Sequence, residues 1–389
     1  MVQGLLQNLT SSVMKFKLFR QNAIDLLRRK SSQRFIPEID ALRFFAILPV
    51  MFAHCSQAFL EYNTNFDREL IESESLLRYV MYQGNLGVEL FFGISGFILA
   101  LPFLGKKIKE LDFRSYFLRR LIRIEPPYLI AISVFFLVHL FIMGQHDFAF
   151  LWDRYVASFF YVHNLAYHSY SYILPPAWSL EIEVQFYLLM PIFILGFCLM
   201  NKAVWRYFLY FLMLMLSLHL DVTPDLDLND YLRYFLAGII AADVYKNVKF
   251  ERFWVWDIFF VVNLFLFFFV FGDWMLRTLS LFLILISSFN LSILKKVVTN
   301  NWVTVIGGMC YSLYLLHFPF YHLVMKIFSD RLTFIDSYEF TFISQALIFV
   351  PLSIVVITGY YLLVEKPFMV LSQKYGKIGK KNTKKLKEA

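Results

Sequence analysis

Arg43 and His54 are two ionisable residues within one apolar stretch, "LRFFAILPVMFAHC". In an α-helix, eleven positions amount to about 20° more than three full turns, over about 16 Å. The two side chains are therefore expected on one face of a helix, at different depths. An ionisable residue inside a membrane segment is a functional candidate, and a histidine exchanges protons near neutral pH. The alternatives are that Arg43 extends to the lipid headgroups and that His54 is a hydrogen-bonded packing residue.

Other ionisable residues also interrupt apolar stretches. Glu183 is expected at about the depth of His54, whereas Glu181, two positions earlier, cannot share its helical face. The remaining candidates of this kind are Glu89, His317 and Glu365. A histidine and carboxylates at similar depth could surround a polar cavity. The alternative is that each carboxylate anchors a neighbouring helix.

Arginines form a separate group in the segment "FRSYFLRRLIRIEPPYL". Arg120 and Arg123 are three positions apart and share a helical face. The planar guanidinium group suits bidentate binding of phosphate, so this face is a candidate site for a phosphorylated ligand. Arginines at the inner boundary of a membrane protein are also expected for topological reasons alone.

The composition indicates the elements that must position these residues. The chain has 389 residues, of which 59% are hydrophobic and 17% charged, whereas soluble proteins are about 25% charged. Its long apolar runs approach the ~20 residues that cross a bilayer as a helix. We therefore expect an all-α, polytopic transmembrane helical bundle, with an outer loop and a partial helix at 144–179. About ten spans are predicted, at 39–60, 84–104, 124–143, 180–200, 204–220, 230–246, 254–271, 275–293, 304–328 and 340–364.

The distribution of Lys and Arg predicts the orientation. These residues concentrate at both ends of the chain and before the third span, so both termini are expected to be cytoplasmic. The predicted parts are a basic cytoplasmic segment at 1–35, a transmembrane domain at 36–368 and a basic cytoplasmic tail at 369–389. The tail is expected to lie near anionic membrane lipid, and no nucleic-acid partner is expected.

Cys55, Cys198 and Cys310 show neither the spacing of metal ligands nor a disulfide pattern. We interpret them as small apolar packing residues, and no metal site is predicted.

Six segments, in order over residues 35–370, resemble the signatures of the acyltransferase-3 family of integral membrane O-acyltransferases. The family's opening helix has a basic residue, ten intervening positions and then a histidine, and Arg43 and His54 fit this spacing. In the second-helix signature, Glu89 stands where Asp is usual. Arg120 and Arg123 fit its Arg-x-x-Arg segment. The remaining matches are Trp178 with Glu183 in "AWSLEIEVQF", Tyr311 with His317 in "YSLYLLHFPF", and Glu365 in "VEKPF". Some members carry a fused extracytoplasmic esterase-like domain, which is not expected here.

The resemblance implies acyl-CoA, most often acetyl-CoA, as a donor substrate, with no bound cofactor. It implies an acceptor hydroxyl outside the cytoplasm, on a cell-envelope glycan or its lipid-linked precursor, and a place in the bacterial inner membrane. Arg119, Arg120 and Arg123 would bind the CoA phosphates. His54 would act as general base or as transient acyl carrier, and Glu183 would orient its imidazole.

Two alternatives remain open from the sequence. Ser95 could carry the acyl group covalently, although nothing in "GISGF" provides an activating partner. A proton-coupled transporter or flippase for an envelope precursor would also keep His, Glu and Arg inside the membrane. Such carriers often contain internal repeats, and none is evident here.

Overall fold

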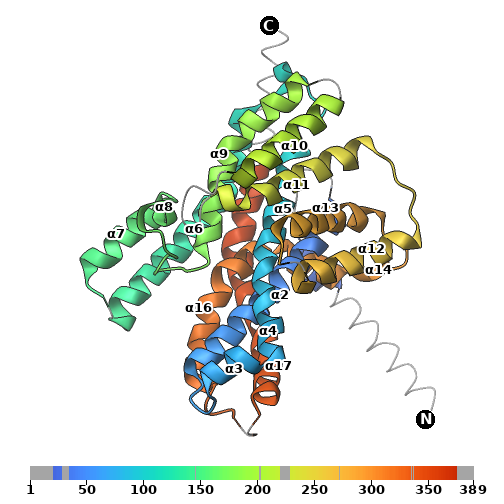
Figure 1. Cartoon of the computed structure of the whole chain (residues 1–389). Coiled ribbons are helices and arrows are strands. Elements are labelled where there is room, and N and C mark those ends of the chain that lie inside the picture. The colour runs from blue at the N-terminus through green and yellow to red at the C-terminus, as the bar shows by residue number, and fades with distance from the viewer. Residues whose placement is uncertain are drawn as a thin grey trace, which may run out of the picture.

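The computed structural model describes residues 21–28, 35–144, 146–200, 203–219, 228–270, 272–333, 335 and 337–374. Throughout this part of the chain the regular elements are helices, which confirms the predicted all-α class (Figure 1). In chain order they are α2 (Pro37–Tyr62), α3 (Arg68–Glu74), α4 (Leu76–Gln83), η1 (Gly84–Leu86), α5 (Gly87–Ala100), η2 (Ile108–Glu110), α6 (Phe113–Val138), η3 (His139–Met143), α7 (Phe148–Phe159), α8 (His163–Tyr167), α9 (Ala177–Leu199), α10 (Ala203–His219), α11 (Leu228–Asn247), α12 (Trp254–Phe265), η4 (Leu266–Val270), α13 (Trp274–Asn290), α14 (Lys295–Val298), α15 (Asn301–Gly308), α16 (Cys310–Phe328), α17 (Tyr338–Tyr360) and η5 (Tyr361–Glu365).

Several helices are long and apolar enough to cross a membrane. Among the described residues there are five, or six if α15 and α16, which are bent by 72° at their junction, form one span. The five are Pro37–Tyr62, Leu76–Ala100, Phe113–Met143, Ala177–Gly196 and Tyr338–Lys374. Together they make the chain an integral membrane protein.

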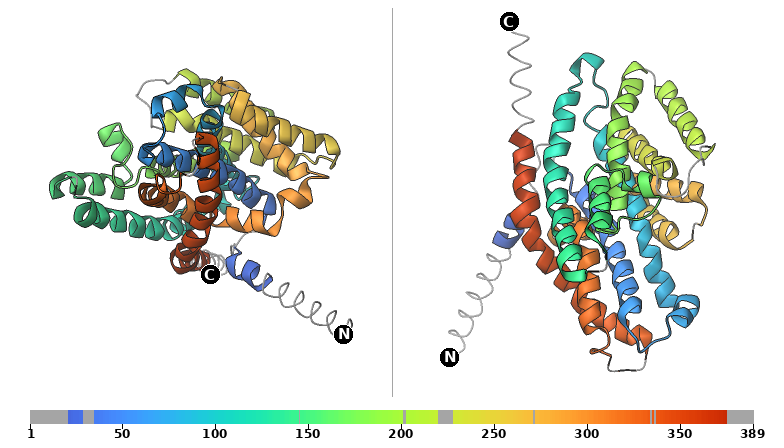
Figure 2. Two further views of the ribbon diagram at one scale, coloured as in Figure 1. Left: turned by 90° about the horizontal axis from the view of Figure 1, so that it is seen from below. Right: turned by 90° about the vertical axis from the view of Figure 1, so that its left-hand side faces the viewer.

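The predicted number of ten spans is not confirmed. The segments predicted at 204–220, 254–271 and 275–293 correspond to shorter apolar helices, Val204–Met215, Trp254–Val270 and Trp274–Asn290. The orientation of the termini also stays a prediction, and most of the predicted basic end segments lie outside the described residues. The region 144–179, expected to hold a partial helix, contains α7 and α8, which extend to one side of the bundle with the end of α6 (Figures 1 and 2).

Helix α2 lies at the centre of the bundle and packs against α5, α15 and α16. Its contact with η1 and α5 is very close. A Cβ atom on Gly84 would lie 2.1 Å from the carbonyl oxygen of Pro49, and one on Gly87 would lie 2.2 Å from that of Ala46. These contacts make α2 and α5 antiparallel. Because a helix rises about 1.5 Å per residue, the run from Gly87 to Ser95 carries α5 about 12 Å from the level of Ala46, past Arg43 and away from His54. His54 itself lies about 16 Å from Arg43 in the opposite direction along α2.

The predicted span at 304–328 is not one straight helix. The bend falls at Met309, directly after Gly307 and Gly308. A Cβ atom on Gly307 would lie only 1.7 Å from the carbonyl oxygen of Asp40, so glycine is required where α15 crosses α2. Glu365 fixes the start of α16 by accepting hydrogen bonds from the backbone N–H of Ser312 over 3.0 Å and from its hydroxyl over 2.6 Å.

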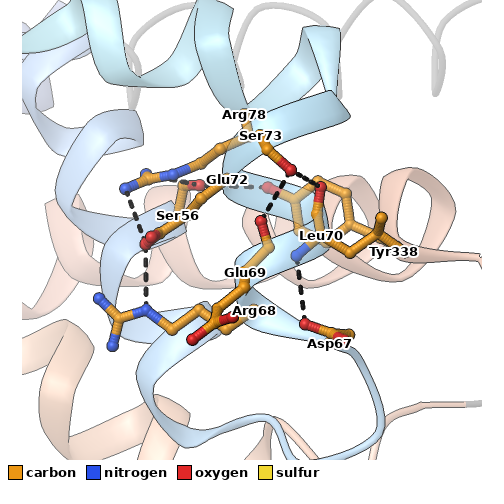
Figure 3. A network of polar contacts seen from close by, with 9 residues as sticks. All are labelled: Ser56, Asp67, Arg68, Glu69, Leu70, Glu72, Ser73, Arg78 and Tyr338. Atoms are coloured by element: carbon orange, nitrogen blue, oxygen red, sulfur yellow. Dashed lines mark hydrogen bonds and ion pairs between the residues drawn. The ribbon is translucent and has the colours of Figure 1, made fainter.

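A polar network joins the C-terminal half of α2 to α3, α4 and α17 (Figure 3). Arg78 donates a hydrogen bond to Oγ of Ser56 over 3.2 Å, and this oxygen lies 3.3 Å from the hydroxyl of Tyr338. Glu72 of α3 pairs with Arg78 of α4 over 3.9 Å and with Arg68, one turn earlier in α3, over 3.0 Å. The short helices α3 and α4 are thereby fastened over the end of α2 that carries His54.

Candidate active site

A cavity of about 100 Å³ lies between α2, α5, α6, α9 and α16. Its wall is polar on several sides although it is enclosed by apolar helices. The polar, thiol and tyrosine side chains that line it are Arg43, Ser95, Arg120, Arg123, Ser179, Glu183, Tyr187, Cys310, Tyr311 and Tyr314. Three arginines and one carboxylate face the cavity, so its lining carries a net positive charge.

Helix α6 contributes the arginines at one end of the cavity. Arg120 and Arg123 both line it, and the guanidinium of Arg120 lies over the ring of Tyr187, 5.3 Å from the centroid. The hydroxyl of Tyr311 donates to the carbonyl oxygen of Ile124 over 2.9 Å, which joins α6 to the start of α16. The third predicted donor residue, Arg119, lies on the same helix but does not line the cavity.

Asp112 caps the start of α6 and lies just before the membrane-spanning segment. Its carboxylate accepts a hydrogen bond from the backbone N–H of Ser115 over 2.9 Å, as an N-terminal cap. Partial burial raises the pKa of Asp112, but hydrogen bonds from Ser115 and the charge of Arg119 outweigh burial, so the pKa lies below its ordinary value. The cap stabilises the end of the helix that presents the arginines.

Ser95 and Glu183 meet in the middle of the cavity wall. The hydroxyl of Ser95 donates to Oε1 of Glu183 over 2.5 Å. Arg43, which also lines the cavity, is paired with Asp40 over 2.6 Å and interacts electrostatically with Glu183. The structure therefore brings together Arg43 of α2, Glu183 of α9 and Ser95 of α5, the last of which was predicted as an alternative nucleophile.

His54 does not line the cavity; its nearest polar partner is another histidine. Nδ1 of His54 lies 2.7 Å from Nε2 of His317. His317 is fully buried, and its ring centroid lies 5.8 Å from that of Tyr314, which does line the cavity. His54 is thus connected to the cavity wall through His317 and Tyr314. In the described part of the chain, no hydrogen bond joins Glu183 to His54.

The other predicted site residues lie outside the cavity. Glu181 is buried and accepts a hydrogen bond from the backbone N–H of Asn164 over 2.8 Å, which ties α8 to α9. Glu89 pairs with Arg277 over 3.6 Å. Trp178 packs against Tyr231 with ring centroids 5.3 Å apart. Glu365 holds the start of α16, as described above.

Several lining residues were not predicted. Ser179 and Tyr314 lie 2.7 Å apart through their hydroxyl oxygens and form part of the wall nearest His317. Tyr187 and Cys310 line it as well. Helical spacing could have indicated three of the four, because Ser179 and Tyr187 lie four positions on either side of Glu183, and Tyr314 lies three before His317.

The chain belongs to the acyltransferase-3 family, whose acyltransferase domain matches residues 36–364. It is 27% identical over 380 residues to the protein named "Putative O-acetyltransferase SACOL0978" of Staphylococcus aureus (strain COL), covering 86% of this chain and 57% of that one. It is 28% identical over 335 residues to "O-acetyltransferase OatA" of Staphylococcus aureus (strain NCTC 8325 / PS 47), covering 75% and 52%. The chain spans about half the length of these curated relatives. No solved structure matches it.

Proposed function

We propose that this protein is a membrane O-acyltransferase that moves an acyl group, which we take to be acetyl, from cytosolic acyl-CoA to a hydroxyl of an acceptor on the opposite side of the membrane. Membership of the acyltransferase-3 family and the names of the relatives support the reaction class. The observation that carries the proposal is the cavity itself. Its lining includes the arginine pair Arg120 and Arg123 and also Tyr314. Tyr314 packs against His317, the residue that contacts His54.

The positive end of the cavity suits the donor. Arginine binds phosphate oxygens through two parallel N–H groups, and Arg120 and Arg123 would hold the CoA phosphates in this way. The thin pantetheine arm would then follow the cavity past Arg43. Its amide groups would find hydrogen-bonding partners in Ser95 and Glu183, and its thioester would reach the wall formed by Ser179 and Tyr314.

The chemistry would take place beside His54. Nε2 of His54 takes the proton from the acceptor hydroxyl as its oxygen attacks the thioester carbonyl carbon. The carbon–sulfur bond breaks, and the proton passes to the leaving thiolate, which gives free CoA. A new ester bond forms on the acceptor, so the reaction needs no cofactor and no further reactant.

The proposed acceptor is a glycan of the cell envelope or its lipid-linked precursor, and the proposed location is a bacterial inner membrane. The predicted orientation supports this assignment, because it puts His54 in the outer half of α2 and the arginines of α6 on the cytoplasmic side. The names of the relatives from Staphylococcus aureus concern O-acetylation alone.

Turnover of acetyl-CoA by the purified full-length protein in proteoliposomes tests the proposal. Free CoA is measured with a thiol reagent, first with water as acceptor and then with solubilised cell-envelope glycan. We expect release of CoA that the glycan accelerates, with acetyl ester appearing on the glycan. A folded protein that neither binds nor consumes acetyl-CoA would overturn the proposal and favour a transporter.

A further inference from the structure

We propose that His317 is a positioning residue that fixes the tautomer and the orientation of His54. The inference rests on the proposed function, because it concerns how His54 is prepared to act as a base. It assigns to a neutral imidazole the task that a carboxylate has in a catalytic triad.

The hydrogen bonds around His317 determine where the protons lie. Nδ1 of His317 is 2.8 Å from the carbonyl oxygen of Leu313, and a carbonyl oxygen can only accept. Nδ1 of His317 therefore carries a proton and donates it. In a neutral imidazole only one nitrogen carries a proton, so Nε2 of His317 is an acceptor.

The same reasoning then applies to His54. Because Nε2 of His317 accepts, Nδ1 of His54 must donate across the 2.7 Å that separate them. Nε2 of a neutral His54 is left with its lone pair, which is the form a general base requires. Among the described residues, Nε2 of His54 has no hydrogen-bond partner, so it remains available to an acceptor hydroxyl.

The surroundings of His317 favour its neutral form. The residue has no exposed surface, and a buried charge is costly without an opposite charge beside it. Its polar contacts in the described part are with the backbone of Leu313 and Tyr314 and with His54. Its ring packs beside those of Tyr314 and Tyr321, at centroid distances of 5.8 and 6.1 Å. None of these groups is a carboxylate.

The arrangement also serves the reaction once it begins. When Nε2 of His54 takes up a proton, its ring becomes a cation that still donates through Nδ1 to His317. Hydrogen bonds from a charged donor are shorter and stronger than neutral ones. The pair therefore stabilises the protonated His54 more than the neutral one, which lowers the barrier to proton transfer.

The simpler alternative is that His317 only fills space between α2 and α16. Two variants separate the roles. His317→Phe keeps an aromatic ring but provides no acceptor for His54, whereas His317→Gln loses the ring but can accept through its side-chain oxygen. A packing role predicts that Phe is the milder change, and a positioning role predicts that Gln is.

The test compares the turnover of acetyl-CoA by wild type, His317→Phe and His317→Gln, with donor KM and thermal unfolding measured for each. We expect His317→Phe to lower kcat about a hundredfold with donor KM nearly unchanged, and His317→Gln to recover at least tenfold of that loss. A His317→Phe protein that turns over within threefold of wild type, or that exceeds His317→Gln, would overturn the inference.

A second measurement does not depend on the variants folding or on activity. In protein labelled with ¹⁵N histidine, we expect the wild-type His54 resonances to show a proton on Nδ1 and none on Nε2 at neutral pH. A proton on Nε2 instead would overturn the inference. Wild-type protein with the expected tautomer but no acyl transfer would contradict the proposed function and leave the histidine pair in place.

Discussion

The hydroxyl of Ser95 donates a hydrogen bond of 2.5 Å to Glu183 inside the cavity that also contains Arg43. A serine bonded to a carboxylate resembles an activated nucleophile. The packing of α5 on α2, however, puts Ser95 beyond the level of Arg43, and Arg43 is already about 16 Å from His54 along the helix. We therefore assign this pair to binding the donor arm, with acyl transfer taking place beside His54.

Replacing Ser95 tests that assignment. Ser95→Ala removes one hydrogen bond to a charged group, worth about 1.5–3 kcal/mol. Turnover of acetyl-CoA should therefore fall by no more than about a hundredfold, and wild-type protein incubated with radiolabelled acetyl-CoA should carry no label on Ser95. Acetyl label at Ser95 together with complete loss of turnover in Ser95→Ala would show that the serine is a covalent relay.

The arginine pair gives a prediction about the donor. Arg120→Lys/Arg123→Lys keeps both charges but loses the planar guanidinium groups and the stacking of Arg120 on Tyr187. We expect acetyl-CoA binding to weaken about tenfold or more, measured by equilibrium dialysis, while loop labelling reports an unchanged topology.

Arg114→Lys is the matched control, because Arg114 lies on the same helix, is exposed and does not line the cavity. It should bind acetyl-CoA as wild type does. Equal affinity in the double variant and in wild type would leave the arginines with a topological role only.

Cys310 provides a natural probe of the cavity. Its thiol lines the wall near Arg43 and Tyr311, whereas Cys55 is fully buried in the bundle. Bound CoA should cover Cys310 and slow its reaction with a small methanethiosulfonate reagent at least fivefold. Peptide mass spectrometry would measure the extent of labelling at both cysteines in one sample, with Cys55 as the internal control. Labelling of Cys310 that saturating CoA leaves unchanged would place the donor elsewhere.

The helices could be predicted from the sequence because long apolar runs have few other structures available in a membrane. The bend at Met309 could not be predicted from hydropathy, since the residues on both sides of it are apolar. Gly307 and Gly308 were the local signal, but the reason for glycine is the carbonyl oxygen of Asp40, which belongs to another helix. The number of spans could not be predicted from hydropathy either, because several apolar runs form helices shorter than the ~20 residues that cross a bilayer.

Only those features of the site that depend on spacing within a single helix were predictable. Spacing within one helix indicated that Arg120 and Arg123 share a face, and both line the cavity. Contacts between helices were not accessible from spacing. The pairing of His54 with His317, and of Ser95 with Glu183, depends on how α2, α5, α9 and α16 are packed together.

The close contact of α5 with α2 gives a prediction about stability. Gly87→Ala adds a methyl group that would lie 2.2 Å from the carbonyl oxygen of Ala46, so the helices must separate. Overpacking of this kind costs about 1–3 kcal/mol, and the unfolding temperature in detergent should fall by several degrees. Gly359→Ala, in α17, is the control, because nothing lies within 4 Å of its added Cβ atom. Equal unfolding temperatures for the two variants would contradict the packing described here.

The central claim is that His54 is the base of an acyl transfer, and its replacement tests that claim most directly. His54→Ala should bind acetyl-CoA and unfold at nearly the wild-type temperature, because the side chain is only half-buried and does not line the donor cavity. Its transfer of acetyl groups to envelope glycan, measured as acetyl ester formed per minute by equal amounts of protein, should be abolished. Transfer by His54→Ala at a substantial fraction of the wild-type rate would remove His54 from the mechanism.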